Sequence, residues 1–392
     1  MTGLVFRLGD RGPAVAEIRA RLARLGLLPG SLYAEEHRDD DPLRSGPSEP
    51  QEDPSLWETT GLVSADFDTE VETAVREFQR RRGITADGVV GPETFRRLEE
   101  ARWRLGDRIL CYGTPHTTVG EDILDLQQRL NALGFSCGRE DGRLGPLTDR
   151  AIHEFQRNTG IGADGVCGPS TFRALGQLRR TVGHYSSQSV REKYSLHELR
   201  TGVRGKLVVL DPCVRDMPDP GSPQATEAAI TAAIAARIEV HLNEIGARVL
   251  VTRSLFDPPS ASTTVEDRAR MCNELGADLV LSIGVSHNPD HPGGPATYFW
   301  GREQGTQSLP GRLAANLISE GITDLTGTPG RGSSPRTSDL LRLTRMPAVR
   351  IELGNLMQPG DRQKLADAAV TEAVARSIAK SVERFFEPEP AV

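Results

Sequence analysis

Lysine, cysteine and aromatic residues are scarce in this chain. Of its 47 basic residues only four are lysine, and the net charge is −7 without any basic block. Nothing in this distribution favours nucleic acid or an anionic membrane surface as a partner. No apolar run approaches the length of a transmembrane span, so we expect no membrane span.

The five cysteines are odd in number, scattered, and contain no C-x-x-C pair. Such spacing argues against a disulfide framework or a structural zinc site and fits a reducing compartment. The N-terminus, MTGLVFRLGDRGPAVAEI, has no basic segment followed by an apolar one, the pattern of a secretory signal. These observations together predict a cytoplasmic protein.

Two segments are expected to lie outside the packed cores. Residues 31–60 are rich in Asp, Glu, Pro and Ser, which predicts a disordered acidic insert. It is either a tolerated loop or a regulatory segment that binds a partner. Residues 181–205 are expected to link the N-terminal half to a C-terminal domain.

The N-terminal half contains an internal repeat. VETAVREFQRRRGITADGVVGPETFRRL at 71–98 is matched by TDRAIHEFQRNTGIGADGVCGPSTFRAL at 148–175. An amphipathic stretch with apolar residues three and four apart precedes each copy, at 14–26 and 122–134. Each Gly-Pro-x-Thr places a proline in the first turn of a helix, where its missing N–H costs little. Each copy therefore predicts a small three-helix unit.

This repeat resembles the peptidoglycan-binding domain 1 family, because F-Q, G-I, D-G and G-P-x-T-F recur in both copies. The resemblance implies two all-α modules, residues 1–104 and 105–180, that recognise peptidoglycan fragments or precursors. We expect the repeated phenylalanines in the module cores and the Asp-Gly and Gly-Pro pairs in turns. Exposed binding residues are not singled out by the pattern.

From Lys206 onward, apolar runs of strand length alternate with helical stretches. This alternation predicts an α/β domain, residues 206–387, with a mainly parallel sheet and helices on both faces. The expected strands are 207–210, 247–252, 278–284, 296–300 and 348–353, and the expected helices are 224–245, 264–275, 310–322 and 361–385. Chemistry in open α/β sheets collects at the carboxyl ends of strands, so we expect a site where three of these strands end.

The strand ends resemble those of the zinc-dependent N-acetylmuramoyl-L-alanine amidases of the Amidase 3 family. Those enzymes cut the amide bond between the glycan and the stem peptide of peptidoglycan. DPCVR at 211–215 stands where the family has Asp-Pro-Gly-His-Gly, and SIGVS at 282–286 stands where it has Ser-Ile-His-Ala-Asn. IELG at 351–354 matches the strand that carries the catalytic glutamate.

The resemblance implies that Val214 and Gly284 replace the two histidine ligands. It implies that Glu227 is the retained ligand and Glu352 the catalytic carboxylate. Zinc in a hydrolase needs three protein ligands and an open position for water, so the inherited mechanism is expected to fail. Glu352 would then persist as a buried carboxylate paired with an arginine such as Arg331, which also matches, by a weak alignment, a substrate-facing position.

A rearranged metal site stays open as an alternative. Cys213 lies next to the first lost histidine and His287 lies three residues past the second, so both could join Glu227 as ligands. The chain would then be an active zinc-dependent peptidoglycan amidase. Under the main interpretation we expect no cofactor.

The order of two peptidoglycan-binding modules and an amidase-like domain resembles a group of actinobacterial regulators. This resemblance implies a degenerate amidase homologue that acts in the cytosol on peptidoglycan precursor synthesis. The implied partner is the UDP-N-acetylglucosamine enolpyruvyl transferase or another enzyme of that pathway, with a Ser/Thr kinase acting on the regulator. The C-terminal stretch ERFFEPEPAV has no Ser or Thr for such a kinase.

Overall fold

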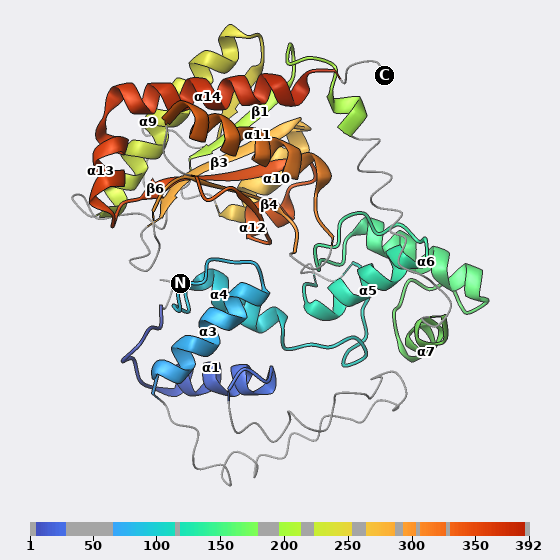
Figure 1. The fold of residues 1–392 in the computed structure, drawn as a ribbon. Helices are drawn as coiled ribbons and strands as arrows, with labels where there is room; N and C mark the ends of the chain where they lie inside the picture. The colour runs from blue at the N-terminus through green and yellow to red at the C-terminus, as the bar shows by residue number, and fades with distance from the viewer. Residues whose placement is uncertain are drawn as a thin grey trace. The chain divides into compact units, whose positions relative to one another are not determined.

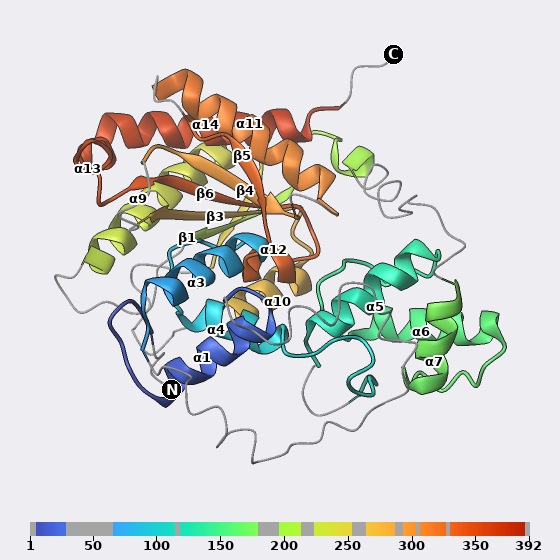
Figure 2. The ribbon, with the colours of Figure 1, turned by 60° about the horizontal axis from the view of Figure 1, so that its bottom comes forward.

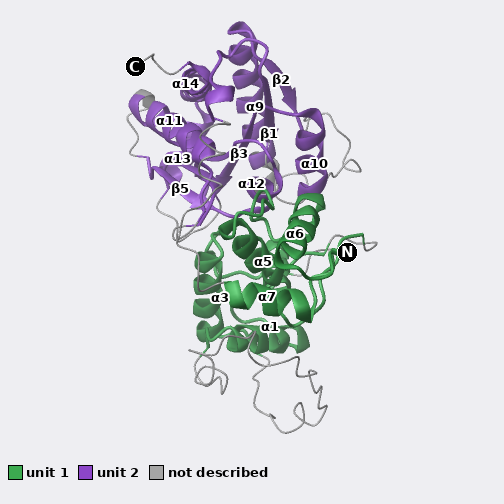
Figure 3. Cartoon of the chain, turned by 90° about the vertical axis from the view of Figure 1, so that its right-hand side faces the viewer, with its two compact units in different colours: residues 1–188 green, residues 189–392 purple. Residues whose placement is uncertain are grey.

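The computed structural model describes residues 5–28, 66–113, 118–178, 196–212, 223–252, 264–286, 293–302, 306–326 and 330–388. The chain forms two compact units, residues 1–188 and 189–392 (Figure 3). The expected acidic insert and the positions of Cys213, Val214 and His287 lie outside the described residues. In the described parts, no helix is both long and apolar enough to cross a membrane.

The first unit contains the two expected three-helix modules (Figure 1). Their helices are α1 (Pro13–Arg24), α3 (Thr69–Arg81) and α4 (Pro92–Glu100), then α5 (Glu121–Ala132), α6 (Pro146–Thr159) and α7 (Pro169–Leu178). A separate apolar core fills each module, and the repeated residues Phe78 and Phe155 are fully buried in them. Phe95 is only partly buried and lies under the guanidinium group of Arg21.

A buried glutamine explains why the repeat keeps Gln, Asp-Gly and Thr. In the second copy, Nε2 of Gln156 donates to Oδ1 of Asp164 at 2.9 Å and to Oγ1 of Thr171 at 3.2 Å. Its Oε1 accepts from the backbone N–H of Gly165 at 2.9 Å. Gly165 has φ +73°, a conformation that glycine adopts without strain. Gln79 makes the same bonds in the first copy.

The same arrangement occurs a third time, on the first helix of the second module. Gln127 donates to Asp141 at 2.9 Å and to Thr148 at 3.0 Å, and accepts from the N–H of Gly142 at 2.8 Å. Here 14 residues separate the glutamine from the aspartate, instead of eight. This different spacing hides the third copy from a search at constant offset.

The second unit is built on a sheet that has six strands in the described residues (Figures 1 and 2). In spatial order they are β2 (Arg248–Val251), β1 (Leu207–Pro212), β3 (Leu279–Ser286), β6 (Ala348–Asn355), β4 (Ala296–Trp300) and β5 (Ser333–Arg336). The first four run parallel, β4 is antiparallel to β6, and β5 is parallel to β4. The expected mainly parallel α/β sheet is confirmed, with one antiparallel junction.

Helices cover both faces of this sheet (Figure 2). One face packs against α9 (Pro223–Glu244), α11 (Leu309–Thr326) and α14 (Ala368–Phe386), and the other against α10 (Val265–Leu275) and α12 (Asp339–Leu343). Side chains alternate between the faces of the sheet. Leu281 and Ile283 therefore join the core on the side of α9, α11 and α14, while Val280 joins the core on the side of α10 and α12. Further along β3, that second face carries polar or small residues.

Three expectations need correction. The helix expected over 361–385 is two helices, α13 (Pro359–Ala366) and α14. They are separated at Asp367, whose side chain caps α14 by accepting from the N–H of Ala369 at 2.8 Å. β5 and α12 were not expected, because Ser333–Arg336 has no apolar pattern and α12 is a single short turn of helix.

The end of the expected linker packs against the second unit. Leu196 and Leu199 contact the core on the side of α9, α11 and α14, and Val203 is buried in that core. The N–H of Gly202 donates to the carbonyl of Phe386 at 2.8 Å. The described part of residues 181–205 is therefore integral to the α/β unit.

Candidate functional site

Adjacent strands bring polar side chains onto one face of the sheet, the face that α10 and α12 partly cover. β6 contributes Arg350 and Glu352 there, two residues apart. Ser282 and Gly284 on β3 lie directly beside them, and Tyr298 on β4 lies beside Arg350 on the other side. The row lies toward the carboxyl end of β6, where the sequence predicts a site.

Glu352 is the centre of this row. Its side chain is 11% exposed, and its Oε2 accepts from the hydroxyl of Tyr298 at 3.0 Å and from Nη2 of Arg331 at 3.1 Å. The same Nη2 donates to the Tyr298 hydroxyl oxygen at 3.0 Å. The expected pairing of Glu352 with Arg331 is present. Tyr298 is a site residue that the sequence did not reveal, because its position on β4 reads as an ordinary core residue of a strand.

The charges around Glu352 hold it in the ionised form. Burial raises the pKa of its carboxyl group, but the guanidinium groups of Arg350, Arg336 and Arg331 together outweigh burial and lower that pKa. Burial and the Glu352 carboxylate raise the pKa of Tyr298. A carboxyl group with a lowered pKa stays ionised at neutral pH, so Glu352 carries a negative charge among these arginines.

Arg350 occupies the space beside Gly284, where the resemblance places a histidine. A Cβ atom added to Gly284 would lie 2.5 Å from Nη2 and 2.9 Å from Cζ of Arg350. Any larger residue there requires the guanidinium group to move. The arginine also donates from Nη1 to Oγ of Ser282 at 3.4 Å. A cationic group therefore lies where the resemblance places a metal ligand.

Ser282 connects this cluster to a second buried ion pair. Its hydroxyl donates to Oδ2 of Asp211 at 3.2 Å, and Nε of Arg268 donates to Oδ1 of Asp211 at 2.7 Å. Thr252 donates to the same oxygen at 2.6 Å. Asp211, the first residue of the family's Asp-Pro turn, thus joins β1 to α10 through Arg268.

Glu227 lies on α9 and is fully buried. Glu227 is therefore not an exposed carboxylate of the kind that is common near helix N-termini. Within the described ranges, no three His, Cys, Asp or Glu side chains are grouped closely enough to hold a metal ion. Gly284 offers no donor atom, and Arg350 brings a positive charge to its side. The described residues do not fit a zinc ion at this position.

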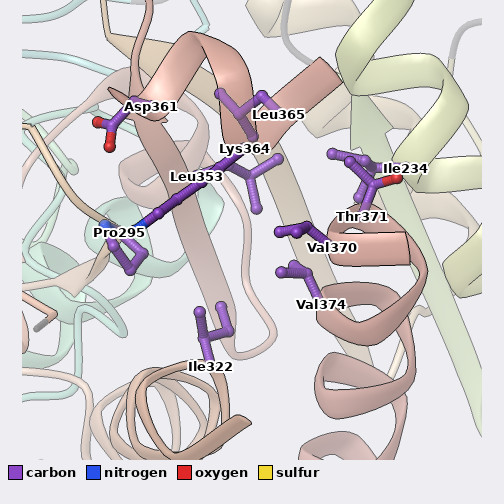
Figure 4. A pocket seen from close by; sticks show the side chains of 10 residues that line it. All are labelled: Ile234, Pro295, Ile322, Leu353, Asp361, Lys364, Leu365, Val370, Thr371 and Val374. Carbon is purple, nitrogen blue, oxygen red and sulfur yellow. The ribbon is translucent and has the colours of Figure 1, made fainter. Parts of the chain in front are cut away.

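A small cavity of about 30 Å³ lies near the other face of the sheet (Figure 4). Its lining is mostly aliphatic and comes from α9, α11, β6, α13 and α14, with Asp361 at its edge. Oδ2 of Asp361 accepts from the N–H groups of Gly294 at 2.8 Å and Asn355 at 2.7 Å. This space is large enough for a water molecule but not for a sugar or peptide.

Comparison with known proteins agrees with this architecture. The model of the N-acetylmuramoyl-L-alanine amidase family matches residues 208–384, and that of a putative peptidoglycan binding domain matches 56–98 and 119–175. N-acetylmuramoyl-L-alanine amidase CwlM of Mycobacterium tuberculosis is 34% identical over 391 residues, which cover 98% of this chain and 90% of CwlM. The chain belongs to the N-acetylmuramoyl-L-alanine amidase family.

Two further similar proteins each cover less than half of this amidase homologue. N-acetylmuramoyl-L-alanine amidase LytC of Bacillus subtilis is 27% identical over 185 residues, covering 46% of this chain and 36% of LytC. Among solved structures, the amidase Ami1 of Mycobacterium smegmatis aligns with a TM-score of 0.42 and 21% identity, covering 47% of this chain and 99% of Ami1.

Proposed function

We propose that this amidase homologue does not hydrolyse peptidoglycan and acts in the cytosol as a regulator of peptidoglycan precursor synthesis. The observation that carries the proposal is the guanidinium group of Arg350 beside Gly284. A metal hydrolase needs protein ligands and an open, water-bearing position there. This chain has a glycine, which offers no donor atom, and a cation beside it.

The proposed partner is the UDP-N-acetylglucosamine enolpyruvyl transferase or another enzyme of the same pathway, under control of a Ser/Thr kinase. The two N-terminal modules would bind peptidoglycan fragments or precursors. A reducing compartment is compatible with the described cysteines, which are free thiols. Burial raises the pKa values of Cys137, Cys167 and Cys272, the last to about 12, so these thiols stay protonated.

Cell fractionation followed by affinity purification tests this proposal. We expect the full chain in the cytosolic fraction, bound to an enzyme of precursor synthesis. Deleting 206–392 should abolish that binding, while deleting 1–180 serves as the matched control for loss of half the chain. Recovery of the protein only from the wall fraction contradicts the proposal, as does partner binding that survives loss of the α/β domain.

The name of the M. tuberculosis relative favours a second candidate, an active zinc-dependent amidase with a rearranged site. In that case Cys213 and His287 would join Glu227 as ligands. The two candidates differ in the metal content of protein purified without chelators or added zinc. We expect well below one zinc per chain and no cleavage of muropeptides. Stoichiometric zinc that is lost in Cys213→Ser or His287→Ala would establish the second candidate.

A further inference from the structure

Two arginines, Arg331 and Arg336, flank Tyr298. Arg331 contacts its hydroxyl group, and Cζ of Arg336 lies 4.3 Å from the centroid of its ring. Arg331 precedes β5, and Arg336 is the last residue of β5, opposite Trp300 of β4. Both side chains therefore lie on the face of the sheet that carries Glu352.

These guanidinium groups keep hydrogen-bond donors available. Each guanidinium group has five N–H donors. In Arg331, Nη2 donates hydrogen bonds to Tyr298 and Glu352, and the side chain is 26% exposed. Arg336 is also partly exposed, and within the described residues its guanidinium group stacks on Tyr298 without donating a hydrogen bond. Both groups are held in place by neighbours yet retain donors that can reach a ligand.

The charge of the cluster favours a negatively charged ligand. The guanidinium groups of Arg336 and Arg331, together with that of Arg350, lie close enough to Glu352 to lower the pKa of its carboxyl group. Gathering like charges at one place costs free energy unless an anion offsets them. A carboxylate or phosphate group fits the planar fork of a guanidinium and forms short, charge-assisted hydrogen bonds with it.

We propose that Arg331 and Arg336, held around Tyr298, form a binding site for an oxyanion, a phosphate or carboxylate group of a small ligand. Glu352 and Tyr298 fix Arg331 before the ligand arrives, so less side-chain freedom is lost on binding. Arg350 adds positive potential from the neighbouring strand. Such a site requires neither the cellular location nor the partner proposed above.

Isothermal titration calorimetry of the full chain at constant, low ionic strength tests the site. The probes are inorganic phosphate, pyrophosphate and acetate, with sodium chloride as the blank. We expect saturable binding of at least one oxyanion, weakened about tenfold or more in Arg336→Gln and in Arg331→Gln. Arg270→Gln is the control, because Arg270 is an exposed arginine of α10 that pairs with Asp267.

The probes also distinguish two sources of the ligand. A preference for pyrophosphate would assign the site to a phosphate-bearing molecule, and a preference for acetate to a carboxylate-bearing one. Thermal unfolding of each variant shows whether it is folded, and if Arg331→Gln is not, Arg336→Gln carries the test. No saturable binding of any oxyanion by the wild type would overturn the proposal. Equal affinities of the wild type and Arg336→Gln would overturn it as well.

Discussion

The guanidinium group of Arg350, on β6, lies against Gly284, on β3. Glu352, two residues further along β6, is the residue that pairs with Gly284. A Cβ at position 284 would lie 2.5 Å from Nη2 of this arginine, so a larger residue there requires the end of the arginine side chain to shift. Restoring a histidine at 284 has to displace a cation from the space that the new ligand would enter.

We therefore predict that ligand restoration depends on Arg350. Val214→His with Gly284→His should leave zinc binding weak, because the guanidinium group repels the ion and obstructs the new imidazole. Adding Arg350→Leu should tighten zinc binding by at least about tenfold, as measured by competition with a chromogenic chelator. The control is the double variant Arg350→Leu with Val214→His, which keeps Gly284. Equal zinc affinity with and without Arg350 would show that the arginine does not control the site.

Glu352 is predicted to stabilise the α/β unit. Glu352→Gln keeps an oxygen for Tyr298 and Arg331 but removes the negative charge among three arginines. Leaving buried charge uncompensated typically costs about 3 kcal/mol. Differential scanning calorimetry should show a lower unfolding temperature, whereas Glu274→Gln, at an exposed position of α10, should have little effect. Equal unfolding temperatures for the two variants would contradict a structural role for this carboxylate.

An ion pair between α9 and α14 predicts a pH-dependent contribution to stability. Nε2 of His241 lies 2.7 Å from Glu372, and its Nδ1 lies 3.1 Å from Glu244. Burial lowers the pKa of His241, but hydrogen bonds to the two carboxylates outweigh it and raise that pKa above 6.5. The stabilisation is therefore complete below pH 6.5 and is lost as pH rises through the higher folded-state pKa.

Urea unfolding at pH 5.5 and pH 9 measures this contribution. His241→Gln should destabilise the protein more at pH 5.5 than at pH 9, and both pH values keep Glu372 ionised because hydrogen bonding to His241 helps to lower its pKa. The control is His197→Gln, at an exposed position. A difference between wild type and His241→Gln that is the same at both pH values would show that the imidazole acts only by packing.

Gln156 is predicted to stabilise the second module. In Gln156→Ala, Asp164, Thr171 and the N–H of Gly165 lose a buried partner, which should cost about 1–3 kcal/mol. Gln177→Ala, at an exposed position of α7, is the matched control. Hydrogen exchange of the Gly165 amide should become faster in the first variant and not in the second. Unchanged exchange would mean that the turn holds without the glutamine.

Local patterns in the chain were enough to predict most of the architecture. Strand-length apolar runs, helical periodicity and the constant offset of the repeat depend on residues close in sequence, and they indicated both modules and the alternating α/β domain. The break at Asp367 and the strand Ser333–Arg336 were missed, because a cap and an edge pairing outweigh weak local preference there.

The arrangement around Glu352 was beyond the reach of such patterns. Position and family resemblance pointed to Glu352 and Arg331, but no sequence spacing connects them to Tyr298 on a strand that runs the opposite way. The contact of Arg350 with Gly284 depends on the register between β3 and β6, and a one-residue shift would send Arg350 to the other face. The sequence shows a glycine where the resemblance places a histidine ligand, whereas the position of the Arg350 guanidinium group depends on the pairing of two strands that are distant in sequence.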